Sequence, residues 1–374
     1  MGLDSPFKQI SSSFGEVSFS LTIICMKRPL LVALSLVLLG AGCLGGSSSS
    51  STDGGVFKSV TAGQEWGQAV VVPSAAGIGT LATTDVLNME MDPQDNKYLY
   101  IGTRESGLLY SEDGGASWRQ PRDSALAVGL IYKVEVDPTD VCTVYVAKGA
   151  RLYATDDCMR SFDSEVYVDN RSGVSVVQVL VDWYAPRTLW IGLSNGDVLR
   201  SGDSGQTWST VLKTGEEISA FLINNTDSRQ ILVSTFNEGI WKTTDGGEHW
   251  EEVDGGLSKL KQSAKVYQMI QSDDSGVVIA ASQYGLTRST DFGSTWEAIP
   301  LLTSPGQVTI RSIGIDVENP TTMYYASNAT FYRTTDGGTT WDTEKFPTSR
   351  IPRVLLVDPE DPQVLYIGVA SATE

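Results

Sequence analysis

Short apolar runs separated by polar turns fill the chain from about residue 55 to its end. One unit, residues 86–118, reads VLNMEMDPQDNKYLYIGTRESGLLYSEDGGASW. It contains an apolar run that ends at an Asp-Pro turn, then a second strand, a short turn and a third strand. Alternating apolar and polar positions bounded by Gly, Asp, Asn and Pro are typical of β-strands and turns. No segment after residue 54 has a convincing run of helical period, so the pattern predicts an all-β protein.

These strand units carry a recurring motif, Ser/Thr-x-Asp-x-Gly-x-Ser/Thr-Trp. Clear copies begin at Ser111, Ser201, Thr243, Ser289 and Thr334. Two altered copies, SVTAGQEW and TDDCMRSF, begin at Ser59 and Thr155, and successive starts then lie 52, 44, 46, 42, 46 and 45 residues apart. A period in this range indicates stacked supersecondary units. The sequence therefore predicts seven units.

The motif forms a turn between two antiparallel strands. Its aspartate can accept hydrogen bonds from the N–H groups of its own loop and from the leading hydroxyl, and its glycine supplies a positive φ. Six of the nine tryptophans hold its last position, as a repeated packing role predicts. The pattern resembles the Asp-box, or BNR, repeat, which implies a β-propeller with the boxes on its outer rim. That resemblance implies structural roles for Asp113, Asp157, Asp203, Asp245, Asp291 and Asp336.

The two ends of the repeat region complement each other. The C-terminal segment VLLVDPEDPQVLYIGVAS supplies two strands of a unit and lacks the third strand and the box. The N-terminal segment GVFKSVTAGQEW supplies those parts. Residues 55–374 are thus expected to form a single seven-bladed β-propeller with four-stranded blades, whose last blade is closed by both chain ends. Closure removes exposed sheet edges.

The first residues predict export. From Met26 to Cys43, a charged start, a short apolar core and the small residues Gly-Ala-Gly before a cysteine resemble a lipoprotein signal peptide, which implies acylation of Cys43. An ordinary cleaved signal is the alternative. Residues 1–25 do not fit this pattern and are interpreted as an upstream extension from a gene start placed too early, and residues 44–54 as a Ser/Gly-rich tether. We therefore expect an extracytoplasmic, membrane-anchored lipoprotein at the cell surface or in the periplasm.

Cysteine usage agrees with export. Cys142 and Cys158 are the only pair in the repeat region, and they flank the hairpin CTVYVAKGARLYATDDC at opposed positions. A disulfide there is geometrically plausible and would reinforce the one interior unit whose box has lost its tryptophan. Two free buried thiols, typical of a reducing compartment, are the alternative.

Charge and composition exclude several functions. A net charge of −18 leaves no basic stripe for nucleic acid. The single histidine, His249, lies inside a box, which disfavours a Ser-His-Asp triad or a histidine-rich zinc site. The Arg350-Ile351-Pro352 string is similar to a sialidase motif, but it follows the last box instead of preceding the first. We assign no catalytic residue, metal or cofactor.

Three families resemble the whole-chain pattern. The photosystem II assembly factors are similar in length, blade number and leader, but their arginine-rich patch has no obvious counterpart here. Sortilin-type receptor propellers and xyloglucan-degrading glycosidases share the phrase VDPxxPxxLYxGT followed by a box. These resemblances favour a lipid-anchored propeller that binds a protein or a glycan and has no catalysis of its own. A polysaccharide-active hydrolase or lyase is the alternative.

The binding face can be predicted from the innermost strands. Aligning the units on the turn residue after each innermost strand puts one residue per unit in a column five positions upstream, namely Leu87, Tyr132, Val177, Ser219, Tyr267, Arg311 and Arg353. Propellers commonly present ligands at this end of the central channel. Tyr132, Tyr267, Arg311 and Arg353 are therefore the predicted ligand-binding residues, suited to a carboxylate and to stacking on a sugar or peptide. Salt bridges around a solvated mouth are the alternative.

Overall fold

The computed structural model describes residues 52–162, 164–273 and 275–372, which belong to one compact unit, residues 49–374. The predicted upstream extension, the signal peptide with Cys43 and residues 44–51 of the tether lie outside the described residues. Within the described part, the regular structure is β-sheet apart from one 3-10 turn, η1 (Leu257–Lys259). The all-β prediction is confirmed.

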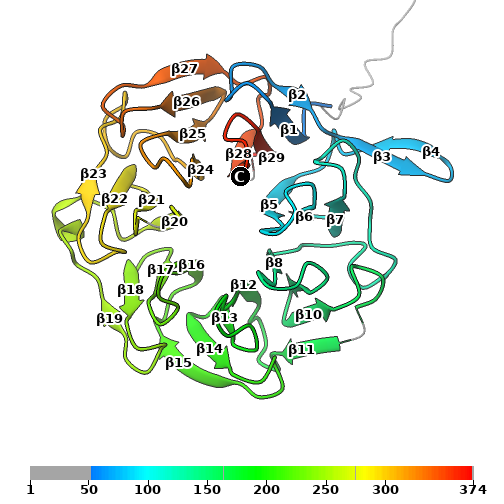
Figure 1. Ribbon diagram of the computed structural model, residues 1–374, viewed down its shortest axis with the longest axis horizontal. Helices are drawn as coiled ribbons and strands as arrows, with labels where there is room; N and C mark the ends of the chain where they lie inside the picture. The colour runs from blue at the N-terminus through cyan, green and yellow to red at the C-terminus, as the bar shows by residue number, and fades with distance from the viewer. Residues whose placement is uncertain (1–51, 163, 274, 373–374) are drawn as a thin grey trace, which may run out of the picture. The chain divides into compact units, whose positions relative to one another are not determined.

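Seven sheets surround a central axis, each with its first strand innermost (Figure 1). Neighbouring innermost strands pack against each other around the whole ring. The prediction of seven blades is confirmed. The five regular interior blades are β8 (Lys133–Val136), β9 (Val144–Lys148), β10 (Arg151–Thr155) and β11 (Ser164–Val168); β12 (Val176–Val181), β13 (Leu189–Leu193), β14 (Asp197–Ser201) and β15 (Ser209–Lys213); β16 (Ile218–Ile223), β17 (Ile231–Thr235), β18 (Ile240–Thr243) and β19 (Glu251–Glu252); β20 (Val266–Gln271), β21 (Val278–Ser282), β22 (Leu286–Ser289) and β23 (Glu297–Ala298); and β24 (Ser312–Ile315), β25 (Met323–Ser327), β26 (Thr330–Thr334) and β27 (Asp342–Lys345).

Both chain ends build the closing blade, as predicted. Its order from the centre outward is β28 (Ile351–Val357), β29 (Leu365–Ala370), β1 (Gly55–Ser59) and β2 (Gly67–Gln68). β1 pairs along its whole length with β29, with Phe57 opposite Ile367. This ladder joins residues about 300 positions apart in the chain, so ring closure is a non-local contact that forms only when both ends are in place.

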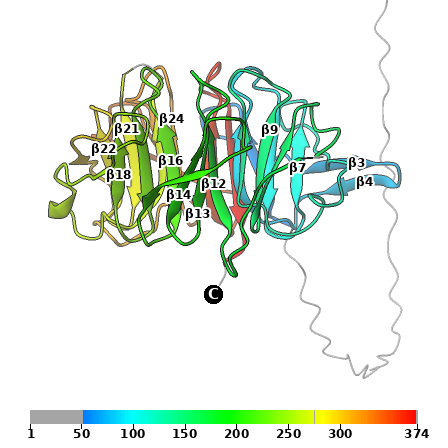
Figure 2. The same cartoon turned by 90° about the horizontal axis from the view of Figure 1, so that it is seen from below.

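The first blade departs from the regular pattern. It contains β5 (Val86–Met91), β6 (Leu99–Thr103) and β7 (Leu108–Ser111). In place of a fourth strand it has a single antiparallel β-bridge between Tyr110 and Arg119. A separate hairpin, β3 (Val71–Ser74) and β4 (Gly77–Thr80), precedes it and projects sideways from the ring (Figure 2). The sequence pattern did not predict this hairpin.

The apolar core lies between blades. One cluster joins Val56 and Tyr366 of the closing blade to Val86, Leu99 and Trp118 of the first blade. Others join each further blade to the next in the same way. Because a blade buries its faces only against its neighbours, the ring is stable as a whole.

The box tryptophans connect adjacent blades. Trp208 donates its indole N–H to the carbonyl of Val166 in the preceding blade, at 2.9 Å, and Trp341 donates to the carbonyl of Pro300, at 2.8 Å. Trp250 makes an edge-on contact with Trp190 of the preceding blade, with ring centroids 6.3 Å apart. The predicted packing role of these tryptophans is confirmed.

Cys142 and Cys158 form a disulfide, with Cα atoms 4.0 Å apart. The two residues flank the β9–β10 hairpin, in which Lys148 lies opposite Arg151 and Val144 lies opposite Thr155. The bridge lies where the box glycine is replaced by Met159, whose φ of 67° is unfavourable for a side-chain-bearing residue. The predicted pairing therefore reinforces an altered box.

Candidate functional site

The box aspartates are occupied by their own turns. Asp203 accepts hydrogen bonds from the Ser201 hydroxyl at 2.8 Å and from the Thr207 N–H and hydroxyl at 2.8 and 2.7 Å. The same three-donor pattern recurs at Asp113, Asp157, Asp245, Asp291 and Asp336, with His249 as a donor at Asp245. Each box follows the third strand of its sheet, so these carboxylates lie on the outer rim, away from the channel.

These hydrogen bonds stabilise the ionised carboxylates. Hydrogen bonds from the Ser161, Thr207 and Thr340 hydroxyls, reinforced by backbone N–H donors, lower the pKa of Asp157, Asp203 and Asp336 to about 2. In the exposed pair of His249 and Asp245, the hydrogen bond to the Asp245 carboxylate raises the pKa of His249 above its ordinary value. No catalytic geometry follows from these loop contacts.

A central channel of about 500 Å³ runs between the innermost strands. Its wall includes six of the seven residues in the predicted column, which are Leu87, Tyr132, Ser219, Tyr267, Arg311 and Arg353. Val177 does not belong to this wall: it is buried in the apolar cluster that contains Trp190 and Ile218, between two blades. Six of the seven column positions therefore line the channel.

Three of the four predicted binding residues lie on consecutive blades. Tyr267 is on β20, Arg311 directly precedes β24 and Arg353 is on β28. The Arg311 guanidinium carbon lies 4.6 Å from the centre of the Tyr267 ring, which is a cation–π contact. Tyr132 directly precedes β8, further around the ring, and packs partly against the apolar clusters of the next blades. The structure thus brings three of these residues together and leaves Tyr132 apart.

The two arginines lack partners within the described residues. Neither Arg311 nor Arg353 forms an ion pair or donates a hydrogen bond there, and the Nε atom of Arg353 is buried. Burial lowers the pKa of Arg353 below its ordinary value, and the positive charges of Arg311 and Arg104 lower it further. The negative charge of Asp85 opposes this lowering. Two cations without an ion-pair partner at a channel wall can chemically accommodate an anion.

Arg104 extends this positive cluster, and sequence reasoning missed it. It follows β6, outside the aligned column, and its charge acts on Arg353 together with that of Arg311. The sequence shows no obvious counterpart of an arginine-rich patch, but the fold assembles Arg104, Arg311 and Arg353 from segments far apart in the chain. Because Arg104 follows the second strand of its blade, the alignment of innermost strands gave no signal for it.

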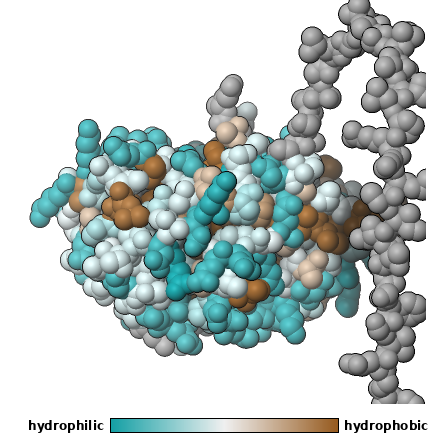
Figure 3. Space-filling view, turned by 90° about the horizontal axis from the view of Figure 1, so that it is seen from above, coloured by the Kyte–Doolittle hydropathy of each residue, from teal (hydrophilic) through white to brown (hydrophobic). Residues whose placement is uncertain are grey.

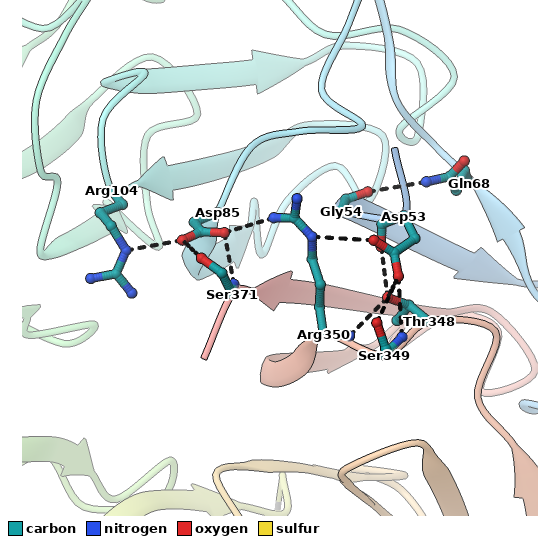
Figure 4. A network of polar contacts seen from close by, with 9 residues as sticks. All are labelled: Asp53, Gly54, Gln68, Asp85, Arg104, Thr348, Ser349, Arg350 and Ser371. Atoms are coloured by element: carbon teal, nitrogen blue, oxygen red, sulfur yellow. Dashed lines mark hydrogen bonds and ion pairs between the residues drawn. The ribbon is translucent and has the colours of Figure 1, made fainter. Parts of the chain in front are cut away.

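A neighbouring polar network fixes the closure of the ring (Figure 4). Asp85 accepts hydrogen bonds from Arg104 Nε at 3.0 Å, from Arg350 Nη1 at 2.8 Å, and from the N–H and hydroxyl of Ser371 at 2.8 and 2.5 Å. Asp53 binds Thr348 and Ser349 and lies 3.5 Å from Arg350 Nε. Arg350 is thus held between two aspartates, which gives the sialidase-like string a structural explanation.

The next two blades of the channel wall after the closing blade, those of β5 and β8, carry two carboxyl groups. The Lys133 ammonium lies 2.6 Å from a Glu90 oxygen and 3.4 Å from a Glu135 oxygen. Burial raises the pKa of Glu135 to about 7, and the Lys133 charge opposes that rise. Burial alone would lower the pKa of Lys133, but Glu90 and Glu135 raise it above its ordinary value. Both carboxyl groups share one cation and come from adjacent blades.

Comparisons with solved structures agree with this fold. A YCF48 structure bound to a D1 peptide aligns with a TM-score of 0.58 and 16% identity over 77% of this chain and 94% of that chain. YCF48 from Cyanidioschyzon merolae aligns with a TM-score of 0.56 and 12% identity over 76% of this chain and 95% of that chain. The GH74 xyloglucanase from Xanthomonas campestris aligns with a TM-score of 0.62 and 17% identity over 76% of this chain and 51% of that chain. This chain is an Asp-box propeller.

Sequence comparisons with this Asp-box propeller point to the same two groups. The family described as Photosynthesis system II assembly factor YCF48 matches residues 220–349. A Paenibacillus xyloglucanase is 23% identical over 79% of this chain and 24% of its own length. A probable oligoxyloglucan-reducing end-specific xyloglucanase from Neosartorya fischeri is 26% identical over 36% of this chain and 19% of its own length. The propeller therefore spans less than a third of these two curated relatives.

The described part of the Asp-box propeller has no helix long and apolar enough to cross a membrane. Among the described residues, the one group of acidic and histidine side chains close enough to share a metal ion is Asp245, Glu248 and His249. All three are exposed, and two of them already bind each other in the box. This cluster is explained by the turn. The channel wall with its arginines remains the candidate functional site.

Proposed function

We propose that this Asp-box propeller is a non-catalytic binding protein that holds an acidic, extended segment of another protein at the channel mouth. The observation that carries this proposal is the pair of half-buried arginines, Arg311 and Arg353, without partners among the described residues of a chain whose net charge is −18. A ligand carboxylate would satisfy both guanidinium groups. Tyr267, fixed beneath Arg311, would pack against the same segment.

The two arginines favour a peptide ligand over a neutral glycan. The matched family region, residues 220–349, includes Tyr267 and Arg311, and a solved relative with the same ring is bound to a D1 peptide. Neutral sugars would not require the two cations. The proposal also includes an extracytoplasmic location and an acyl anchor on Cys43, and both of these rest on the sequence alone.

The double variant Arg311→Ala with Arg353→Ala tests the proposed site. Short fluorescent acidic peptides with a free or an amidated C-terminus serve as probes, measured by anisotropy. Hydrogen bonds to a charged group contribute about 1.5–3 kcal/mol each, so the double variant should bind at least about 100-fold more weakly. Its unfolding midpoint should stay near that of the parent.

A control matched for charge is Arg160→Ala with Arg229→Ala, because both arginines are exposed and lie outside the channel wall. This variant should retain binding. Full binding by the folded Arg311 and Arg353 double variant would move the site elsewhere, and weak binding by both double variants would indicate only a general charge effect.

The second candidate is a glycoside hydrolase. The similarity to xyloglucanases and the two channel carboxyl groups, with the pKa of Glu135 raised to about 7, favour it. The shared Lys133 cation argues against it, since both carboxyl groups are already bound. Release of reducing ends from xyloglucan oligosaccharides that is lost in Glu135→Gln and in Glu90→Gln would establish the hydrolase and overturn the non-catalytic proposal.

A further inference from the structure

The β3–β4 hairpin is an uncharged projection on a strongly acidic protein. Residues 66–84 contain no charged side chain, although the whole chain carries a net charge of −18. Ile78 is 83% exposed and Val71 is 41% exposed. In the space-filling view a hydrophobic area interrupts the mainly hydrophilic surface on the right, the side to which the hairpin projects in Figure 1 (Figure 3). Nothing in the proposed peptide site requires this element.

The orientation of the backbone groups along β4 follows from its pairing. Val71 lies opposite Thr80, Val72 opposite Gly79, and Pro73 opposite Ile78. The carbonyl of Val71 accepts a bond from the Trp118 N–H at 2.8 Å, so it points away from β4. In an antiparallel ladder, pairs that exchange hydrogen bonds alternate with pairs that do not. Val72 and Gly79 therefore exchange bonds, whereas Ile78 and Thr80 direct their N–H and C=O groups outward.

This outward edge has no protein cover within the described residues, because β4 pairs only with β3 in its sheet. Natural edge strands are usually protected by charges, by proline or by a bulge. β3 has Pro73, but β4, which reads GIGT, has none of these devices. An exposed edge of this kind is a template for another strand.

We propose that β4 pairs antiparallel with β4 of a second copy of this chain, about a two-fold axis at Gly79. In this register Ile78 lies opposite the second copy's Thr80, and Thr80 opposite its Ile78. Each of these two pairs exchanges two hydrogen bonds, so all four outward N–H groups find carbonyl acceptors. The two Gly79 residues face each other at the axis as a pair without mutual hydrogen bonds, and they bring no side chains that would clash.

The edge fits a second copy better than a lipid surface. Its outward backbone groups would lose water in a bilayer without gaining partners, which is costly, whereas self-pairing satisfies them. The absence of charge from residues 66–84 also avoids repulsion between two acidic copies at this point. Because so short a strand buries little area, the dimer should be weak and depend on concentration.

The test uses the full-length chain with Cys25→Ser and Cys43→Ser as parent, in detergent, so that only introduced thiols cross-link. At the axis the two Cα atoms should lie about 4.5 Å apart, within disulfide range. The Gly79→Cys variant should therefore give a covalent dimer on mild oxidation. The control variant Ala75→Cys, at the exposed hairpin tip, should give far less. Sedimentation of the parent should show a dimer fraction that rises with concentration.

Ile78→Lys should abolish the dimer fraction, because it places two like charges at the pairing edge. Since Ile78 is exposed, the substitution should leave folding unaffected. An unchanged urea midpoint checks this point. The proposal is overturned if the parent stays monomeric, if Gly79→Cys and Ala75→Cys cross-link equally, or if the Ile78→Lys dimer persists. Binding of monomers to phosphatidylcholine vesicles through the hairpin would instead identify a lipid surface as the partner and would also overturn it.

Discussion

Replacing Asp85 by alanine should destabilise the ring more than any surface charge change. The Asp85 side chain is 11% exposed and accepts four hydrogen bonds, two of them from the guanidinium groups of Arg104 and Arg350. Removing one partner of a buried ion pair costs about 3–5 kcal/mol, because the remaining charge stays buried. Arg350 also contacts Asp53, which retains part of its pairing, so we expect a loss of about 3 kcal/mol in the free energy of unfolding.

The sign of the pH dependence gives an independent check on Asp85. Burial alone would raise its pKa, but hydrogen bonds from Ser371 and Arg104 lower it below the ordinary value. A carboxyl group with a lowered folded pKa stabilises the fold above its unfolded pKa of about 3.9 and loses that contribution as pH falls through the folded value. The difference in stability between the parent and the Asp85→Ala variant should therefore be constant near neutral pH and shrink on acidification.

Urea unfolding followed by tryptophan fluorescence measures both effects. Asp227→Ala is the matched control, since Asp227 pairs with the largely exposed Arg229 on the outside of the protein and should contribute at most about 1 kcal/mol. Equal losses in the two variants would refute the reasoning, as would an Asp85 effect that grows on acidification. Either result would mean that closure depends on the apolar β1–β29 ladder and not on this network.

Three further predictions concern the blades. Deleting residues 355–374 removes the last three residues of β28 and all of β29, so the truncated chain should aggregate or lose its cooperative unfolding transition. Gly247→Ala should lower the free energy of unfolding in urea by about 2–4 kcal/mol, because the new Cβ would lie 2.5 Å from the Trp190 ring and the backbone φ is 88°. The control Gly246→Ala has open space around its Cβ at a φ of 72°, so it should lose only the backbone strain of about 1–2 kcal/mol. Cys142→Ser with Cys158→Ser should lower stability by about 3 kcal/mol, and intact-mass analysis of alkylated, unreduced parent should find neither cysteine modified.

The sequence predicted the ring because the box repeats at every blade. Each copy contains the donors, the acceptor and the positive-φ glycine of its own turn, so its structure is local and can be read from eight residues. Blade number and closure by both ends then follow from counting. The hairpin was missed because residues 67–84 lie between a box and the next innermost strand, where no period applies. The longest box interval, 52 residues between Ser59 and Ser111, was its only sign.

The candidate site was predicted in part. Column alignment identified Arg311 and Arg353 because innermost strands repeat with the boxes. It failed at Val177, an apolar side chain that is buried between two blades. Arg104 and Arg350 lie outside that column. Their roles depend on contacts with Asp85 across as many as 265 positions of chain, which no local pattern encodes.

Net charge was a poor guide to this surface. A chain with a charge of −18 suggests that arginines are neutralised by nearby carboxylates, and Arg104 and Arg350 do behave in that way. Asp85, however, binds both of them, and although its charge also acts on Arg353, no carboxylate of the described chain forms an ion pair with Arg311 or Arg353. The network that closes the ring thus leaves the neighbouring cations uncompensated. Ring closure and the proposed anion site are therefore coupled, and Asp85→Ala should alter peptide binding as well as stability.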